Sequence, residues 1–322
     1  MRWPRWLPVD PFIAALLGTV VLATLLPARG SAADVGRVAA TLAVALLFFL
    51  HGARITPRAA FAGARHWRLH LVVLFATYAL FPLIGLAAAP LRPDVLTPEL
   101  YQGLLFLCAV PSTVQTSIAF TAIAGGNVPA AVFSASFSNL AGVVLTPLLA
   151  TALLHDTGAA RMSAGAVGTV VLQILVPFAL GQLSRPLTAR WIERHRTLTS
   201  RVDRGSILLV VYTAFSAGVV AGVWDEVSPA RLGVLVAVVC VLLALVLGLT
   251  YAAGRLLRFD RADRATILFC GSKKSLATGL PMAAVMVSPQ LLGLLVLPLM
   301  LYHQIQLVVC AWLARRWGAR QA

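Results

Sequence analysis

Acidic residues are scarce in this chain of 322 residues, which has 11 aspartates and glutamates against 26 lysines and arginines. Only 11% of its residues are charged, while 60% are hydrophobic. With a mean hydropathy of +0.89, this composition excludes a water-soluble globular protein. It is the composition of a polytopic membrane protein.

The few acids all fall at the ends of apolar segments or between them. They are Asp10, Asp34, Asp94, Glu99, Asp156, Glu193, Asp203, Asp225, Glu226, Asp260 and Asp263. Since intramembrane cation sites usually take their charge from carboxylates, a charged sodium cage is not expected here. An intramembrane enzyme would need paired acids, a metal cluster or a nucleophile with its base, and no such set occurs within the apolar segments.

Neither the cysteines nor the histidines predict a metal site. The four cysteines, Cys108, Cys240, Cys270 and Cys310, fall inside apolar segments, and their spacing suggests neither disulfides nor a metal site. His66 and His70 have the i, i+4 spacing of a metal pair. They adjoin basic and aromatic residues without an acidic companion, so we interpret them as ordinary interfacial residues.

Ten apolar segments are candidates for membrane-spanning helices, each of which needs about 20 residues. They are 11–27, 37–53, 69–90, 100–124, 128–154, 165–183, 205–223, 231–253, 264–287 and 289–313. These segments predict an all-α protein with a single transmembrane domain over residues 1–322.

The arginines alternate between the two sides of the predicted membrane. If the N-terminus is cytoplasmic, 19 arginines lie inside and five lie outside, at 29, 37, 92, 161 and 231. This is a strong positive-inside signal. It predicts both termini in the cytoplasm, fits a bacterial inner membrane, and accounts for the net charge of +15 without nucleic acid as a partner.

The connector 183–205 lies at the middle of the chain and suits a helix on the inner surface. It divides the ten segments into two sets of five, about 1–155 and 164–316. Because five is odd, the two sets have opposite orientations, which is the layout of an inverted-topology repeat. Cleavage of the first segment as a secretory signal would leave nine segments and destroy this arrangement.

Two polar stretches interrupt the fourth and ninth segments at matching places. They are CAVPSTVQTSIAFTAIAGGN, 108–127, and CGSKKSLATGLPMAAV, 270–285. Such paired breaks are the best sequence pointer to a transporter's binding site, because a helix opens in a membrane only where protein or a water-lined cavity satisfies its backbone. The alternative is that Pro111 and Pro281 are simple kinks in continuous helices.

Lys273 and Lys274, in the second stretch, are the only lysines of the chain. A cation at mid-membrane costs from about 2.5 to more than 10 kcal/mol, so these amines must face polar groups. Alternatively, they snorkel to the inner interface. An amine in such a setting beside a second amine is a candidate for proton exchange, and converging helix N-termini together with ammonium groups favour an anionic ligand.

We therefore predict a binding site for a small, anionic substrate around the two breaks. Its candidate residues are Ser112, Thr113, Gln115, Thr116, Ser117, Asn127, Ser138, Cys270, Lys273, Lys274, Ser275, Thr278 and His303. No organic cofactor is expected. The coupling ion, if any, is sodium or a proton, and the oligomeric state stays open, with a homodimer as one arrangement.

These features resemble the bile acid:sodium symporter family, and more closely its divergent SBF-like branch. The likeness covers roughly residues 10–315 and includes the ten-segment order, the PST-Q-TS stretch that ends in GGN, the LTPLL ending of the fifth segment and GSKKSLATGLPM. The resemblance implies a core bundle in which the fourth and ninth helices are unwound and cross at mid-membrane. Beside it stands a panel of the first, second, sixth and seventh helices, and movement of core against panel gives alternating access.

The resemblance also implies that sodium, where it is used, binds at Thr116 and Ser117. Sodium-coupled members add a carboxylate and a glutamine in the ninth helix, where this chain has Cys270 and Lys274. This difference argues against sodium coupling and against bile acid as the substrate. A channel or a regulatory membrane component without carrier activity is the alternative function, because broken helices also build pores.

Overall fold

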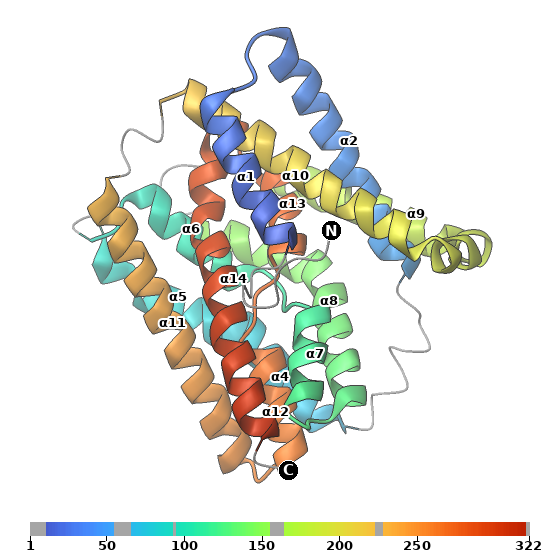
Figure 1. Ribbon diagram of the computed structural model, residues 1–322, viewed down its shortest axis with the longest axis vertical. Coiled ribbons are helices and arrows are strands. Elements are labelled where there is room, and N and C mark those ends of the chain that lie inside the picture. Colours follow the sequence, from blue (N-terminus) through green and yellow to red (C-terminus); the bar gives the residue numbers. More distant parts are fainter. Residues whose placement is uncertain (1–10, 55–65, 93–94, 155–163, 223–227, 320–322) are drawn as a thin grey trace. The chain divides into compact units, whose positions relative to one another are not determined.

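The computed structural model describes residues 11–54, 66–92, 95–154, 164–222 and 228–319 (Figure 1). Within these ranges every regular element is a helix, which confirms the predicted all-α class. The helices are α1 Pro11–Leu25, α2 Ser31–Arg54, α4 Trp67–Phe75, α5 Phe81–Ala87, α6 Pro98–Ala109, α7 Gln115–Ile123, α8 Val128–Leu154, α9 Ala164–Arg194, α10 Arg196–Val220, α11 Pro229–Leu256, α12 Arg261–Gly271, α13 Leu276–Met286 and α14 Pro289–Gly318.

Six helices of the described part are long and apolar enough to cross a membrane by themselves. They are Ser31–Arg54, Trp67–Ala87, Val128–Leu154, Arg196–Val220, Pro229–Leu256 and Pro289–Gly318. The segment Ala14–Leu25 is apolar but shorter. The predicted fourth and ninth segments appear as helix pairs, α6 with α7 and α12 with α13.

Side chains in the sequence set where several helices begin. Ser228 and Asp260 accept hydrogen bonds from the backbone N–H groups of Arg231 and Asp263, at the starts of α11 and α12. Thr97 does the same at the start of α6, where Pro98 follows. These are the residue types that satisfy the free N–H groups of a helix N-terminus.

The connector at the middle of the chain differs from its prediction. Residues 183–205 do not form a separate helix between two spans, because α9 continues to Arg194 and α10 begins at Arg196. The segment has no glycine before Gly205 to end a helix, and Pro186 is accommodated within α9. Since polar sequence does not stop a helix, both helices extend beyond their apolar parts.

The chain folds into two compact units. Unit 1 comprises residues 1–54, 176–227 and 287–293, and unit 2 comprises residues 55–175, 228–286 and 294–322. Each unit therefore combines segments from both halves of the sequence.

In unit 1, α2 and α9 approach so closely that only glycine fits at two positions. A Cβ atom on Gly52 would lie 2.1 Å from the carbonyl oxygen of Phe178, and one on Gly181 would lie 2.1 Å from the carbonyl oxygen of Phe49. Small residues of this kind let helix backbones pack directly in a membrane, where no hydrophobic effect drives helices together.

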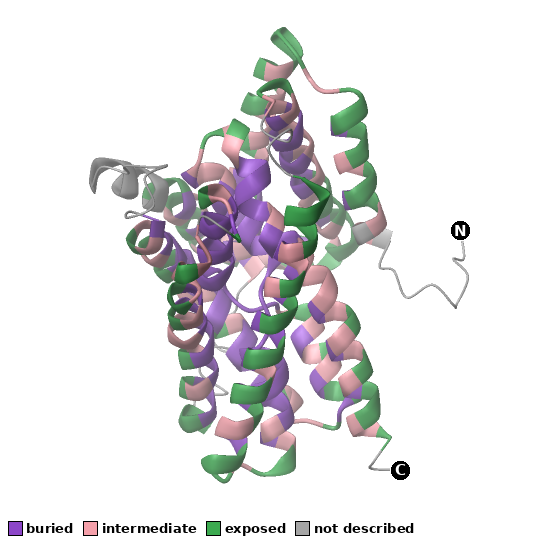
Figure 2. Ribbon diagram, turned by 90° about the vertical axis from the view of Figure 1, so that its left-hand side faces the viewer, coloured by how far each residue is buried: buried purple, intermediate pink, exposed green. Residues whose placement is uncertain are grey.

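Unit 2 contains a helix that is buried on every side. All residues of α6 from Leu100 to Ala109 are buried, whereas α11 exposes the apolar side chains of Val241, Leu245 and Leu249. Buried and exposed residues are drawn in purple and green in Figure 2. Exposed apolar side chains on a spanning helix are expected where it faces lipid.

We predict that Gly181→Ala destabilises the protein, because the added methyl group collides with the α2 backbone. Overpacking of this kind costs about 1–3 kcal/mol, even though alanine favours helix more than glycine does. Gly18→Ala in α1 is the matched control, because a Cβ atom there meets no atom within 4 Å. The apparent melting temperature in detergent should fall for Gly181→Ala and hold or rise for Gly18→Ala. Equal behaviour of the two variants would contradict the close contact.

Candidate functional site

Two helices of unit 2 are interrupted where the sequence predicts breaks. Residues Val110–Val114 separate α6 from α7, and residues Ser272–Ser275 separate α12 from α13. The chain turns extended at Val110, with ψ 156°, immediately before Pro111, which lacks an N–H group to donate. Pro281 lies inside α13 and is not the cause of the second break.

The two interruptions bond directly to each other, and we name segments 110–114 and 272–275 together the crossing. The N–H group of Ser275 donates to the carbonyl oxygen of Pro111 at 2.8 Å. The Ser112 hydroxyl donates to the carbonyl oxygen of Cys270 at 2.6 Å. Backbone groups that one break releases are thus satisfied by the other interrupted segment, as a low-dielectric interior requires.

Helix α8 satisfies the first break with polar side chains. The Ser138 hydroxyl accepts from the N–H group of Ser112 at 3.2 Å, and the Asn139 amide donates to the carbonyl oxygen of Ser112 at 2.7 Å. Asn139 also accepts from the Thr278 hydroxyl at 2.9 Å, so it joins α8 to α13. Thr146 donates to the carbonyl oxygen of Ala109 at 3.0 Å.

Helix α14 satisfies the second break. The Gln306 side chain accepts from the N–H group of Lys274 at 2.9 Å and donates to its carbonyl oxygen at 2.8 Å. Tyr302 donates its hydroxyl hydrogen to the carbonyl oxygen of Ser272 at 2.6 Å. His303 lies beside this pair, with Nδ1 2.9 Å from Gln306 Nε2.

The Lys274 side chain is fully buried, and its amine has a complete set of partners. Nζ donates to the carbonyl oxygens of Thr77, Cys108 and Val110, each at 2.8 Å. It also lies 4.0 Å from the centroid of the Phe81 ring, a cation–π distance. An ammonium group has three N–H donors, and all three are used here. We name these three oxygens the carbonyl cage.

The oxygens of the carbonyl cage are available because three local features deprive them of helical partners. One π-helical turn, Ala76–Leu80, directs the Phe81 N–H group to Ala76, and Pro82 has no N–H group, so the Thr77 oxygen stays free. The N–H group of Ser112 turns to Ser138 instead of Cys108. At Val110 the chain leaves the helix altogether.

Lys273 is equally buried, but its environment is different. Its Nζ has no hydrogen-bond partner within the described residues. It lies 3.8 Å from the centroid of the Phe120 ring, and Phe120 packs edge-on against Phe269 at 6.2 Å. The adjacent lysines therefore divide into one amine with every donor used and one with every donor unused.

Three hydroxyl groups at the start of α7 form a cluster of their own. The Thr116 hydroxyl donates to Thr113 Oγ1 at 2.8 Å, and Thr113 Oγ1 lies 2.9 Å from Ser117 Oγ. Oxygen atoms at such a place could bind a hard cation. In this structure they bond to one another.

Most of the remaining candidate residues belong to the crossing or touch it. Ser275 accepts from the N–H group of Thr278 at 3.2 Å, and Cys270 supplies the carbonyl oxygen that Ser112 binds. Gln115, the first residue of α7, is exposed.

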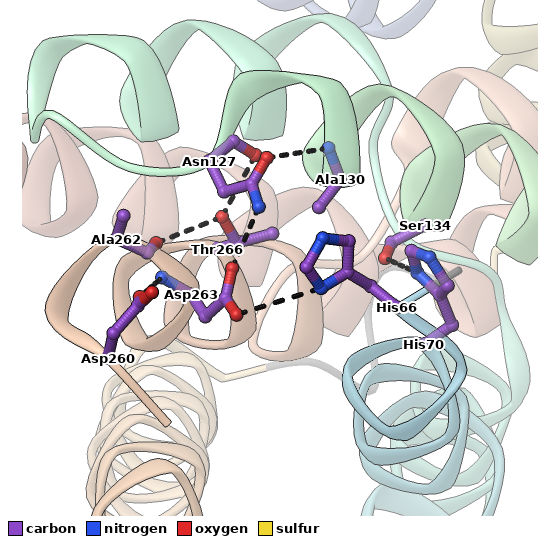
Figure 3. Close-up of polar contacts among 9 residues, drawn as sticks. All are labelled: His66, His70, Asn127, Ala130, Ser134, Asp260, Ala262, Asp263 and Thr266. Carbon is purple, nitrogen blue, oxygen red and sulfur yellow. Dashed lines mark hydrogen bonds and ion pairs between the residues drawn. The ribbon is translucent and has the colours of Figure 1, made fainter. Parts of the chain in front are cut away.

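Asn127 lies in a different polar cluster, which joins the α7–α8 turn to α12 (Figure 3). Its amide donates to Asp263 Oδ1 at 2.8 Å, and its carbonyl oxygen accepts from the Thr266 hydroxyl at 3.1 Å. These contacts hold the start of α12 in place. They involve no residue of the crossing.

The histidine pair has a companion that the sequence analysis missed. His66 Nδ1 lies 4.0 Å from Asp263 Oδ2, so the statement that no acid accompanies the pair is wrong. The acid is 197 positions away in the sequence and becomes a neighbour only through the fold. His70 instead lies 2.7 Å from the Ser134 hydroxyl, so the two rings do not act as one pair.

Sequence reasoning also missed several residues that build the crossing. Thr77 and Phe81 surround the Lys274 amine, and Asn139, Thr146 and Gln306 satisfy the backbone of the breaks. Pro82 indicates only that a carbonyl oxygen of the preceding turn is released; it does not identify Thr77, whose oxygen is freed by the π-helical turn. Asn139 and Gln306 resembled ordinary polar residues between helices.

Comparison with known proteins identifies one matching family and several similar proteins. The model of the SBF-like CPA transporter family matches residues 10–319. The chain is 50% identical over 309 residues to the Escherichia coli protein named "Putative symporter YfeH", covering 96% of this chain and 93% of that one. It is 54% identical over 321 residues to an uncharacterized protein of Pseudomonas aeruginosa, covering 100% and 96%. It is 28% identical over 271 residues to mouse sodium/bile acid cotransporter 7, covering 83% and 79%.

We predict that the two lysines differ sharply in their contribution to stability. Lys274→Met leaves three buried carbonyl oxygens without donors, at about 1–3 kcal/mol each, so the apparent melting temperature in detergent should fall strongly. Lys273→Met removes an amine that makes no hydrogen bond, so its effect should stay within about 1 kcal/mol or be stabilising. If Lys273→Met is as damaging as Lys274→Met, the described division between the two amines is wrong.

Proposed function

The chain belongs to the SBF-like CPA transporter family, and on that premise we propose that it is a secondary active transporter of a small anionic organic solute. It is a multi-pass membrane protein with bacterial relatives. The family and two of the relatives reported above are transporters by name, which argues against an enzyme. The substrate class is our inference from the electrostatics of the crossing.

The anion is supported by the excess of positive charge at the crossing. Helices α7 and α13 both begin there, and the first turn of a helix carries a partial positive charge. Two lysines add to it, and the bonded partners of Lys274 in the described structure are carbonyl oxygens rather than carboxylates. An anion is the ligand that such a region favours.

The carbonyl cage supports transport that does not depend on sodium. It is the single observation on which the proposed mechanism rests. Three carbonyl oxygens around a cation are the type of coordination that sodium would otherwise receive. Here the cation is the Lys274 ammonium group, which is part of the chain. We infer that Lys274 takes the place of a bound metal ion, and that Lys273, with its unused donors, exchanges a proton or contacts the anion.

The architecture that we propose is ten spans in two inverted five-helix repeats, with both termini in the cytoplasm. Unit 2 would be the core bundle, because it holds both broken helices, and unit 1 would be the panel. In support, unit 1 contains α1, α2, most of α9 and α10, which correspond to the first, second, sixth and seventh predicted spans. Movement of one unit against the other would give alternating access.

We predict that ligand binding does not require sodium. A thermal-shift screen of organic and inorganic anions should find ligands that raise the apparent melting temperature, by the same amount in sodium and in choline buffers. Such a ligand should then show counterflow in liposomes, where unlabelled ligand inside accelerates the entry of labelled ligand. Stabilisation that needs sodium would contradict the role of Lys274. Flux without trans-stimulation would indicate a pore.

We predict that Lys273→Met abolishes counterflow although the protein stays folded. Removing the amine takes away both a positive charge and a proton-exchanging group, while the carbonyl cage of Lys274 is unchanged. The same liposome assay measures the effect, with the exposed Cys240→Ala as a control that should transport like the parent chain. Counterflow that persists in Lys273→Met would remove this lysine from the mechanism.

A further inference from the structure

A second feature of unit 2 lies away from the crossing, among α11, α12 and α14. It is a cavity of about 510 Å³ whose walls include Gly248, Tyr251, Arg261, Arg264 and Trp317. No residue of segments 110–114 or 272–275 lines it. This cavity is therefore distinct from the candidate transport site.

The two arginines of the cavity have more donors than partners. Arg261 donates to the carbonyl oxygen of Trp317 at 2.8 Å. The Arg264 Nε atom is buried and has no hydrogen-bond partner within the described residues. Both arginines line the cavity, and a guanidinium group has five N–H donors and no acceptor, so the cavity favours a ligand with acceptor oxygens.

Acidic side chains do not neutralise these arginines in the described structure. None of the residues that line the cavity is acidic. The two acids nearest in sequence are engaged elsewhere, because Asp260 accepts from the N–H group of Asp263 and Asp263 accepts from the Asn127 amide. The cavity thus has a net positive charge at one end.

The rest of the wall is apolar and aromatic. Leu247, Leu268 and Leu313 line it, and Tyr251 packs edge-on against Trp317 at 5.9 Å. Arg255 lies over the Tyr251 ring at 5.9 Å. Tyrosine, tryptophan and arginine together are typical of the level where lipid headgroups meet the hydrocarbon.

The position of the cavity along its helices also agrees with the level of the lipid headgroups. The cavity lies near the C-terminal ends of α11 and α14 and the start of α12, where Arg255, Arg261, Arg315 and Arg316 also occur. By the positive-inside rule an arginine-rich end faces the cytoplasm, and the cytoplasmic leaflet carries the anionic lipids.

We propose that this cavity binds one anionic phospholipid of the cytoplasmic leaflet. The phosphate oxygens accept hydrogen bonds from Arg264 and Arg261, which suit phosphate geometrically. The first part of an acyl chain lies against Leu247 and Leu313. A free anion would satisfy the arginines but leave the apolar wall unused, so the structure favours the lipid.

Native mass spectrometry of the full-length protein tests this, with phosphatidylglycerol as the probe, phosphatidylcholine as the neutral lipid and glycerol phosphate as the free headgroup. We expect retention of one phosphatidylglycerol and a raised apparent melting temperature. Phosphatidylcholine and glycerol phosphate should have little effect. Equal binding of phosphatidylcholine, or an equal effect of glycerol phosphate, would overturn the assignment to an anionic lipid.

Two variants and a control test whether the lipid binds at this cavity. Arg261→Gln with Arg264→Gln should weaken phosphatidylglycerol binding about tenfold or more. Gly248→Phe should block the cavity, since a Cβ atom there meets no atom within 4 Å, and it leaves both arginines in place. Arg315→Gln with Arg316→Gln removes the same charge from α14 and should bind lipid like the parent chain. Unchanged binding in Gly248→Phe, or equal losses in the control, would overturn the site, whatever the outcome of the transport assays.

Discussion

The carbonyl oxygens that two broken helices release inside unit 2 are the constraint on which the structure depends. In a region without water, each free oxygen must find a donor. Hydroxyl and amide side chains of α8 and α14 satisfy several of them. Two more, from Cys108 and Val110, meet at Lys274 together with the Thr77 oxygen that the π-helical turn Ala76–Leu80 releases, and one ammonium group has the three donors that these acceptors need. The π-helical turn Ala76–Leu80, the start of α5 and the end of α6 therefore meet around that amine.

Much of this arrangement was predictable from the sequence, because its causes are local. Pro111 marks the first break, and a lysine pair between serines marks the second, since neither would be stable in a continuous apolar helix. The partners of these residues were not predictable. The Thr77 oxygen becomes available through the π-helical turn Ala76–Leu80, which ends 30 positions before Val110, and the proline that follows it, Pro82, is also compatible with a simple kink. Nothing in the sequence distinguishes the two adjacent lysines. Only their neighbours in the folded structure do so. The same limit explains why Asp263 was missed as a neighbour of His66.

Lys273 and the arginine-lined cavity are connected by packed aromatic rings. Phe120, beneath the Lys273 amine, contacts Phe269, and Phe269 contacts Trp317 at 6.3 Å. Trp317 is also a wall of the cavity. Rings packed edge to face resist independent movement. A ligand that orders Trp317 would therefore also restrict the rings of Phe269 and Phe120 beside the Lys273 amine. These three rings are the structural element that the proposed lipid site shares with the crossing.

The carbonyl cage also has a consequence for bioenergetics. A sodium ion in such a place dissociates, so its occupancy follows the salinity on either side of the bilayer. A side chain tethered by covalent bonds does not leave the cage, so its presence there is the same in fresh water and in brine. The tethered side chain cannot be released on the far side, so it cannot draw work from a sodium gradient. A carrier built in this way would have to take its driving force from the solute itself or from hydrogen ions.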